Sequence, residues 1–139
     1  MNKKTLFFSI TLFLVILDQL TKFLIRTYKP ELKITNFLSI SYTTNTGIAF
    51  GLFKGYNIIF IIISLIFLGL IIYYYKTKKT YTAPFILITS GLIGNLIDRI
   101  FLGNVIDFIN LSFWPAFNIA DSCITIGAII LVIQLIKKK

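Results

Sequence analysis

Two aspartates in the last third of the chain are the residues best suited to do chemistry. Asp107 stands in the segment GNVIDF at 103–108 and Asp121 in FNIAD at 117–121, and both segments are surrounded by apolar sequence. A carboxylate in or near a membrane is costly in free energy, so it usually serves a function. If folding brings the two together, one carboxyl group can be ionised while the other holds a proton. We therefore treat Asp107 and Asp121 as a candidate acid/base pair.

The composition indicates an integral membrane protein. Of the 139 residues, 57% are hydrophobic and 14% are charged, and the mean hydropathy is +0.88. An average soluble domain contains about 25% charged residues. A soluble fold of this size could not bury so much apolar surface, so we expect residues 1–139 to form one integral membrane domain.

The net charge of +9 is interpreted as a signal of membrane orientation. Eight of the 14 basic residues form three clusters, at 3–4, 76–79 and 137–139, and each cluster borders a hydrophobic segment. Lysine and arginine are enriched on the cytoplasmic side of membrane-spanning segments. We therefore expect no nucleic-acid partner.

The residues that are absent limit the chemistry further. The chain has no histidine, which excludes a Ser-His-Asp triad, a Cys-His pair and a zinc site with histidine ligands. The single cysteine, Cys123, has no partner for an internal disulfide, and Glu31 is the only glutamate. Among hydrolytic mechanisms, carboxylate chemistry on aspartates is the main one left, and we expect no cofactor.

Four segments are long and apolar enough to cross a bilayer, which needs about 20 such residues per helix. They are residues 6–25, 57–75, 84–102 and 119–136. The lysine clusters place both termini in the cytoplasm, so the connections at 26–56 and 103–118 face outward. The first segment is too long for the apolar region of a signal peptide and lacks a small-x-small cleavage site, so we expect a retained helix.

The first outer connection is predicted to contain a small β-sheet resting on the membrane, within residues 32–55. Residues 38–43 alternate apolar and polar side chains, as a half-exposed strand does. The Asn45-Thr46-Gly47 segment is typical of a turn, and residues 48–53 are predicted to return as a second strand.

Polar residues gather at the outer ends of the predicted helices. Asp18 and Lys22 are four residues apart and share a helix face, which predicts a buried ion pair that supports the fold. Asn95 and Arg99 share a face by the same spacing and are candidates for holding substrate carbonyls, although arginine also commonly extends to the interface for structural reasons. Gly91 and Gly94 are expected to allow close helix packing.

The last predicted helix has a clear start. Asn118 is a good N-cap residue, and it places Asp121 at the third helical position. An acidic residue there often only complements the helix dipole. The common depth of Asp18, Asn95 and the two aspartates favours one shared site instead.

Five sequence blocks stand out along the chain: DQLTK at 18–22, NTGIAFG at 45–51, GNLIDR at 94–99, VIDF at 105–108 and FNIAD at 117–121. Together they resemble the bacterial lipoprotein signal peptidases, or signal peptidase II, a family of aspartic membrane proteases. Each block alone is weak evidence, but all five occur in order across the four predicted spans. The resemblance implies four transmembrane helices with a small extracytoplasmic β-sheet cradle.

The resemblance also implies roles for individual residues. The catalytic pair corresponds to Asp107 and Asp121, and structural support to Asp18 and Lys22. The substrate-binding positions are Asn45, Gly47, Asn95, Arg99 and Asn118. The implied substrate is a prolipoprotein with a diacylglyceryl-modified cysteine, cut just before that cysteine at the outer face of the bacterial cytoplasmic membrane. The resemblance further implies contact with membrane lipids, inhibition by globomycin-like cyclic peptides and a monomeric state.

Several alternatives remain open at this point. A non-enzymatic membrane assembly factor would use the aspartates only in structural ion pairs. A proton-coupled transporter would place its acids near the midplane and usually has more helices or repeats. A Ser-Lys protease would use Lys22 as base, but Ser90 lies too deep. A magnesium or calcium site needs more oxygen ligands than the sequence offers, so no metal is expected.

Overall fold

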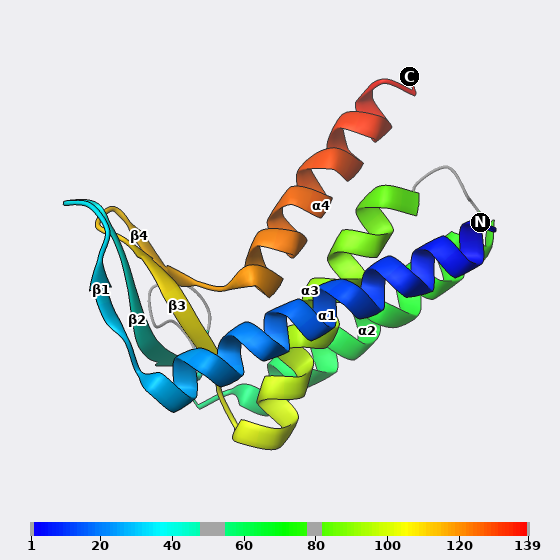
Figure 1. Ribbon diagram of the computed structural model, residues 1–139. Helices are drawn as coiled ribbons and strands as arrows, with labels where there is room; N and C mark the ends of the chain where they lie inside the picture. Colours follow the sequence, from blue (N-terminus) through cyan, green and yellow to red (C-terminus); the bar gives the residue numbers. More distant parts are fainter. Residues whose placement is uncertain (1, 48–54, 78–81, 139) are drawn as a thin grey trace.

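Four apolar helices and a four-stranded antiparallel sheet make up the fold (Figure 1). The structure is a computed structural model, and it describes residues 2–47, 55–77 and 82–138. The helices are α1 (Lys3–Tyr28), α2 (Asn57–Thr77), α3 (Thr82–Leu102) and α4 (Ile119–Ile136). All four are long and apolar enough to cross a membrane, and the predicted spans at 6–25, 57–75, 84–102 and 119–136 fall within them.

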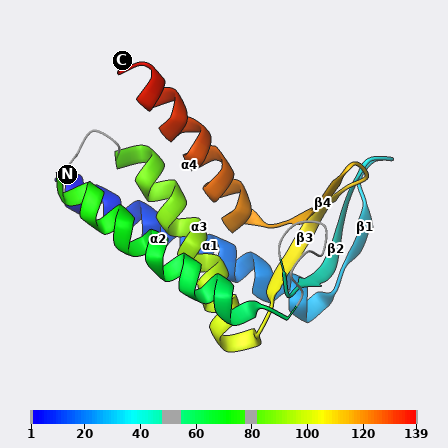
Figure 2. The same ribbon diagram turned by 180° about the vertical axis from the view of Figure 1, so that it is seen from behind.

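Helix α3 is the centre of the bundle. It packs against α1, α2 and α4. Half of the most apolar stretch of α3 is buried, a larger share than in the other candidate membrane spans of the described residues. Helix α4 diverges from α1 towards its C-terminal end (Figures 1 and 2). The first turn of α4, which carries Asp121, lies at the end of the bundle near the sheet, and Gly127 and Leu131 further along α4 pack against α3 and the apolar cluster around Phe85.

Glycines permit the close approach of α3 and α4. A Cβ atom at Gly91 would collide with the carbonyl oxygen of Ala120, and one at Gly94 would lie 3.2 Å from the Ala120 Cβ atom. At Gly127 an added Cβ would lie 3.0 Å from the Pro84 carbonyl oxygen. The predicted packing role of Gly91 and Gly94 is therefore confirmed.

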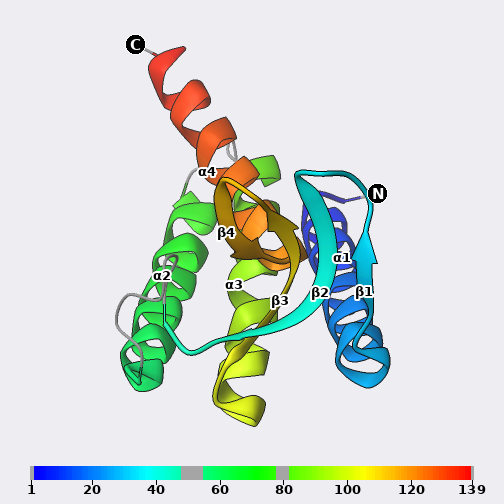
Figure 3. The ribbon, with the colours of Figure 1, turned by 90° about the vertical axis from the view of Figure 1, so that its left-hand side faces the viewer.

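The sheet has the order β1-β2-β3-β4 and caps one end of the bundle (Figure 3). Its strands are β1 (Glu31–Lys33), β2 (Leu38–Asn45), β3 (Val105–Leu111) and β4 (Trp114–Phe117). Two hairpins, one from each outer connection, are joined by pairing between β2 and β3, in which Asn45 lies opposite Val105 and Thr43 opposite Asp107.

The sheet differs from the predicted one in its pairing. Strand β2 begins at Leu38 as predicted, but its partners are β1 and β3, and half of the sheet comes from residues 105–117. The predicted returning strand at 48–53 lies outside the described residues. No strand was predicted in the connection at 103–118, because β3 pairs with β2 from a distant part of the sequence and such pairing leaves no local pattern.

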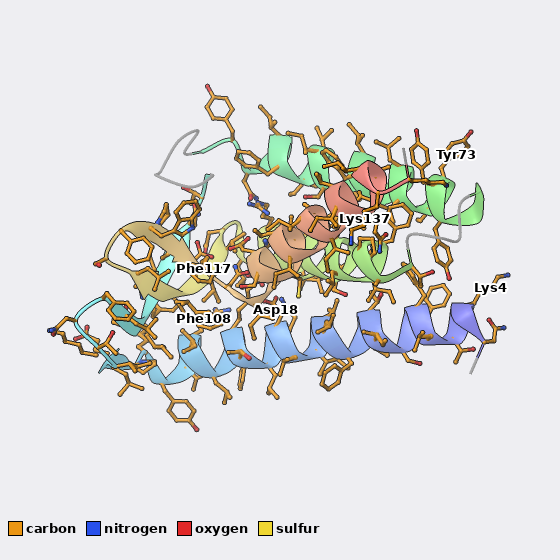
Figure 4. The ribbon with its side chains drawn as sticks, turned by 90° about the horizontal axis from the view of Figure 1, so that it is seen from above. Lys4, Asp18, Tyr73, Phe108, Phe117 and Lys137 are labelled. Atoms are coloured by element: carbon orange, nitrogen blue, oxygen red, sulfur yellow. The ribbon has the colours of Figure 1, made fainter. Side chains whose placement is uncertain are left out.

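Two apolar clusters hold the ends of the bundle. At the end with the N-terminus, Phe7 packs with Ile71, Phe85 and Ile86. At the sheet end, Ile106 and Phe108 of β3 pack against Ile25 of α1. Figure 4 shows Lys4 and Tyr73 at one end and Phe108 at the other, with Asp18 closer to Phe108. The sheet is thereby anchored where the polar residues gather.

Candidate active site

The first aspartate of the candidate pair lies on the sheet. Asp107 is on β3 opposite Thr43 of β2, and its side chain is only 2% exposed. Its Oδ2 accepts a hydrogen bond from Nδ2 of Asn45 at 3.1 Å, and its Oδ1 accepts one from Nδ2 of Asn118 at 2.8 Å. Asn45 ends β2, so the β2–β3 register is what brings it to Asp107.

The second aspartate lies in the first turn of α4. The side chain of Asn118 caps this helix by accepting a hydrogen bond from the backbone N–H of Asp121 at 2.8 Å. In return, Oδ2 of Asp121 accepts a hydrogen bond from the backbone N–H of Asn118 at 3.2 Å. This is the reciprocal capping box, so the predicted N-cap is confirmed. Oδ1 of Asp121 accepts from Nδ2 of Asn95 at 2.7 Å.

Asn118 joins the two carboxylates. Its side-chain amide donates to Asp107, and its backbone N–H donates to Asp121. It is fully buried, and its Nδ2 also lies 3.2 Å from the Ile106 carbonyl oxygen. One residue that begins a helix therefore holds a carboxylate from the sheet and a carboxylate from the helix in one site.

The surroundings of Asp107 make its protonated form accessible near neutral pH. The pKa of Asp107 is raised from 3.8 to about 7, chiefly by burial and in addition by the negative charge of Asp121. The hydrogen bonds from Asn45 and Asn118 act in the opposite direction because they stabilise the charged form. A carboxyl group with this pKa can donate a proton under physiological conditions.

A second polar cluster lies directly beside the pair. The ammonium group of Lys22 is 2.8 Å from Oδ2 of Asp18 and 2.9 Å from Oδ2 of Asp98, and all three side chains are nearly fully buried. Lys22 also donates to Oδ1 of Asn95 at 3.1 Å, and Asn95 in turn donates to Asp121. The predicted ion pair of Asp18 and Lys22 is confirmed, and it is connected to the candidate catalytic residues through Asn95.

This ion cluster fixes α4 in place. Oδ1 of Asp18 accepts from the backbone N–H of Ala120, in the first turn of α4, at 2.9 Å. Gln19 donates to Oδ1 of Asp98 at 3.0 Å and to the carbonyl oxygen of Gly94 at 3.1 Å. Hydrogen bonds from Asp18 and Gln19 thus tie α1, α3 and α4 together next to Asp121.

Arg99 lies at the edge of the site. Its guanidinium carbon is 5.3 Å from the centre of the Phe60 ring, and its backbone carbonyl accepts from Nδ2 of Asn57 at 2.9 Å. Arg99 interacts electrostatically with both Asp121 and Asp107. Gly47 donates its backbone N–H to Oδ1 of Asn45 at 2.9 Å, which orients the Asn45 amide towards Asp107.

The arrangement is suited to activating water on a carbonyl group. Two carboxylates share one buried asparagine, and amides rather than cations provide their hydrogen bonds. Among the described residues, no group of three or more His, Cys, Asp or Glu side chains is placed to hold a metal ion. The geometry therefore brings two carboxyl groups to one buried asparagine.

Comparison with known proteins identifies the family. The family model described as signal peptidase (SPase) II matches residues 10–137. The lipoprotein signal peptidase of Thermodesulfovibrio yellowstonii is 44% identical over 139 aligned residues, which cover 94% of this chain and 95% of that protein. The lipoprotein signal peptidase of Halothermothrix orenii is 37% identical, with 92% and 93% covered.

The chain belongs to the signal peptidase II family. It is an aspartic-type membrane peptidase. A solved structure described as a bacterial membrane enzyme has a TM-score of 0.89 and 34% sequence identity, and the match covers 96% of this chain and 88% of that one. A second such structure has a TM-score of 0.86 at the same identity. The resemblance inferred from the five sequence blocks is confirmed.

The structure of this signal peptidase II brings most of the predicted site residues together. Hydrogen bonds or ion pairs connect Asn45, Asn95, Asn118 and the two aspartates to one another and to Asp18 and Lys22. Arg99 and Gly47 lie at the periphery of this network.

Two partners in the network, the buried Asp98 and the half-buried Gln19, were not predicted as site residues. Asp98 provides the second carboxylate to Lys22, and Gln19 bridges Asp98 and Gly94. Both stand inside the sequence blocks at 18–22 and 94–99. Their place inside these blocks was the only sequence signal, and it does not say which residues they contact.

Proposed function

We propose that this enzyme removes the signal peptide from diacylglyceryl-modified prolipoproteins, cutting just before the lipidated cysteine, with Asp107 and Asp121 as the catalytic pair. The observation that carries this proposal is the bridging position of Asn118, which binds both carboxylates at once. Residues 1–139 would form a single peptidase domain with this one site.

The two aspartates would have different protonation states. The N-terminus of α4 and its capping box favour negative charge on Asp121. The pKa of Asp107, raised to about 7 mainly by burial, allows it to hold the shared proton. Asp121 would therefore serve as the general base and Asp107 as the general acid, with titration belonging to the pair.

The reaction follows from these roles. Asp121 takes a proton from a water molecule, whose oxygen attacks the carbonyl carbon before the cysteine, while Asp107 transfers its proton to the carbonyl oxygen. A tetrahedral diol results. Asp121 then gives its proton to the amide nitrogen as the C–N bond breaks, and one hydroxyl of the diol returns a proton to Asp107. The products are the carboxyl end of the signal peptide and the amino group of the lipidated cysteine.

The neighbouring polar residues would position the substrate and the pair. The contacts of Asn95 and Asn118 with the aspartates support a role in orienting the carboxylates in addition to substrate binding. Arg99 lies at the edge of the site and would hold a backbone carbonyl of the substrate, as would Asn45 and Gly47 near the end of β2.

The site would face the outside of the bacterial cytoplasmic membrane. Both chain ends and the adjoining ends of α2 and α3 lie at one end of the bundle, and the sheet lies at the other (Figure 1). The lysine clusters at 3–4, 76–79 and 137–139 support placing the first end, with both termini, in the cytoplasm. We further propose a monomer in contact with membrane lipids, inhibited by globomycin-like cyclic peptides and needing no cofactor or nucleic acid.

A cleavage assay with purified protein tests this proposal. Wild type, Asp107→Asn and Asp121→Asn are each given a diacylglyceryl-modified prolipoprotein and its unmodified counterpart in detergent. We expect wild type alone to cut, and only the lipidated form, before the cysteine. Cleavage that survives either substitution would remove the aspartate pair from the mechanism. A folded wild type that cuts neither substrate would favour the membrane assembly factor.

Arg99 is tested in the same assay against a distant basic residue. We expect Arg99→Ala to reduce kcat/KM by about 10²-fold, because substrate positioning contributes directly to the rate. Lys4→Ala, at the opposite end of the bundle, is the control and should leave kcat/KM within about twofold of wild type. Equal losses in the two variants would contradict the proposed role of Arg99.

A further inference from the structure

An apolar groove lies beside the candidate catalytic pair, between the β3–β4 hairpin and the first two turns of α4. Its volume is about 340 Å³. Aromatic side chains of the hairpin form one wall and side chains of α4 form the other; the principal lining residues are Phe113, Trp114, Phe117, Asp121, Thr125 and Ile126. Because Asp121 also lines it, the groove is continuous with the proposed site of cleavage.

The groove is open, and most of its lining is apolar. Phe113 is 72% exposed, Trp114 57% and Ile126 51%. These side chains lie at the sheet end of the bundle, where aromatic residues of membrane proteins meet the interface between lipid and water. A polar peptide segment would find few hydrogen-bond partners there, whereas an acyl chain needs none.

Helix α4 extends the groove in one direction. Ile126, Ile129 and Ile133 follow one another at helical spacing, and each is exposed on the surface of α4. This stripe leads from the level of Asp121 towards the other end of the bundle. A chain that starts next to Asp121 can therefore run along α4 in the direction in which lipid chains of the outer leaflet run.

We propose that this groove binds one fatty-acyl chain of the lipidated cysteine and so sets the position of the bond to be cut. The inference rests on the proposed function, because it assigns the lipid of that same substrate. The cysteine follows the scissile bond directly, so its thioether lipid must lie within a few ångströms of the two aspartates. A volume of 340 Å³ is at the lower end of the range for small-molecule sites, which suits part of one chain rather than both.

The groove would act mainly by positioning the lipidated cysteine of the substrate. A chain that moves from bilayer lipid into an apolar groove gains little hydrophobic free energy, because the lipid is equally apolar. What the groove adds is packing that holds the cysteine in register with Asp121. The expected signature is therefore a dependence of kcat/KM on acyl-chain length that disappears when the groove is filled.

The test compares chain lengths in wild type and in a filled groove. Lipobox peptides with S-diacylglyceryl cysteine are prepared with palmitoyl or butyryl chains and assayed in detergent. We expect wild type to prefer the palmitoyl substrate, and Ile126→Trp to lower kcat/KM for it by about tenfold but by about twofold or less for the butyryl substrate. Ile136→Trp, at the exposed far end of α4, is the matched control and should keep the wild-type preference.

The outcomes separate this inference from the proposed function. If wild type cuts lipidated peptides without regard to chain length, or if Ile126→Trp affects both substrates equally, the acyl-chain groove is wrong while the peptidase function stands. If wild type cuts no lipidated peptide, the proposed function itself fails.

Photo-crosslinking provides a second measurement that does not depend on turnover. A diazirine in the palmitoyl chain, bound to the Asp107→Asn variant, should label peptides that contain Trp114 or Ile126. Labelling confined to α2 would overturn the proposal.

Discussion

Two clusters of buried carboxylates lie next to each other in this molecule, and they are stabilised in different ways. In the first, Asp18 and Asp98 both form ion pairs with Lys22, at 2.8 and 2.9 Å. In the second, Asp107 and Asp121 have no lysine or arginine within salt-bridge distance in the described ranges, and their hydrogen bonds come from amides. The first cluster is held by ion pairs with one cation, whereas the second is held by hydrogen bonds from neutral amides.

Asn95 connects the two clusters by hydrogen bonds. Its Oδ1 accepts a hydrogen bond from Lys22, and its Nδ2 donates one to Asp121. A buried charge that is paired with an opposite charge stabilises one arrangement of the helices. A buried carboxyl group whose nearest partners are neutral amides has a raised pKa, as Asp107 does, and can exchange a proton near neutral pH. The type of partner, not burial alone, therefore distinguishes the structural from the proposed catalytic aspartates.

The largest expected effect comes from removing a carboxylate of the proposed catalytic cluster. We expect Asp107→Asn to lower kcat by at least about 10³-fold, because an amide can neither donate nor accept the transferred proton. The free energy of unfolding should change by less than about 2 kcal/mol, since the amide keeps most of the shape and one acceptor. Cleavage of the lipidated substrate and thermal unfolding in detergent measure the two quantities.

The same change in the ion cluster should have the opposite effect. Asp98→Asn is the matched control, and it should lower stability more than Asp107→Asn does while the folded fraction keeps far more activity. If both variants lose stability equally and activity equally, the distinction between the two clusters is wrong.

Removing the cation should be the most destabilising single change in the ion cluster. Lys22→Met leaves Asp18 and Asp98 buried without their common partner, which costs about 3–5 kcal/mol for a broken buried pair. We expect a large fall in the thermal unfolding midpoint of the protein in detergent. Lys4→Met, at an exposed position, is the control and should leave the midpoint unchanged. An unchanged midpoint for Lys22→Met would show that the ion pairs do not hold the helices together.

A glycine tests how tightly the ion cluster is enclosed. A Cβ atom at Gly94 would lie 2.6 Å from Oδ2 of Asp18, so Gly94→Ala must displace that carboxylate. We expect a loss of about 1–3 kcal/mol, measured by thermal unfolding. Gly69→Ala, where an added Cβ meets nothing within 4 Å, should instead be neutral or stabilise α2 by up to about 1 kcal/mol. A stable Gly94→Ala variant would contradict the tight enclosure.

The smallest expected effects are the changes of activity and stability with pH, and they test the raised pKa of Asp107. The proposed mechanism needs protonated Asp107, so kcat/KM should fall as the pH rises through about 7. The pKa of Asp107 is raised on folding, from 3.8 to about 7, so the folded protein binds a proton that the unfolded chain releases in this window. Its contribution to stability is therefore fully present below pH 3.8 and is lost as the pH rises through about 7.

Asp107→Asn should flatten this part of the stability curve between about pH 4 and 7. Thermal unfolding across that range, compared with wild type, measures the difference. An identical slope in both proteins would mean that the pKa of Asp107 does not shift on folding.

Local features of the fold were predictable from sequence. The apolar runs at 57–75 and 119–136 correspond to α2 and α4 closely, because a membrane span needs a minimum number of consecutive apolar residues. Asn118 and Asp121 were predicted as N-cap and third residue of a helix, since a cap depends only on residues three positions apart. The start of β2 at Leu38 followed from its alternating side chains.

Long-range features were not predictable. No strand was predicted for the segment from Val105 to Leu111, which is one of the two central strands of the sheet and pairs with β2. Asp98 was not expected beside Lys22, because spacing along α3 says nothing about which face meets α1. Gln19 was likewise missed, since its three acceptors lie on two helices.

The sequence by itself therefore determined the membrane spans, the cap of α4, the ion pair at four-residue spacing and the family, all of which rest on neighbouring residues or ordered blocks. Only the tertiary structure decided how the aspartates are divided between the two clusters. That division depends on α3 placing Asp98 at Lys22 and Asn95 at Asp121, and on the β2–β3 register placing Asn45 at Asp107. The energy of a buried carboxylate depends on the partners that folding brings to it, and these come from distant parts of the chain.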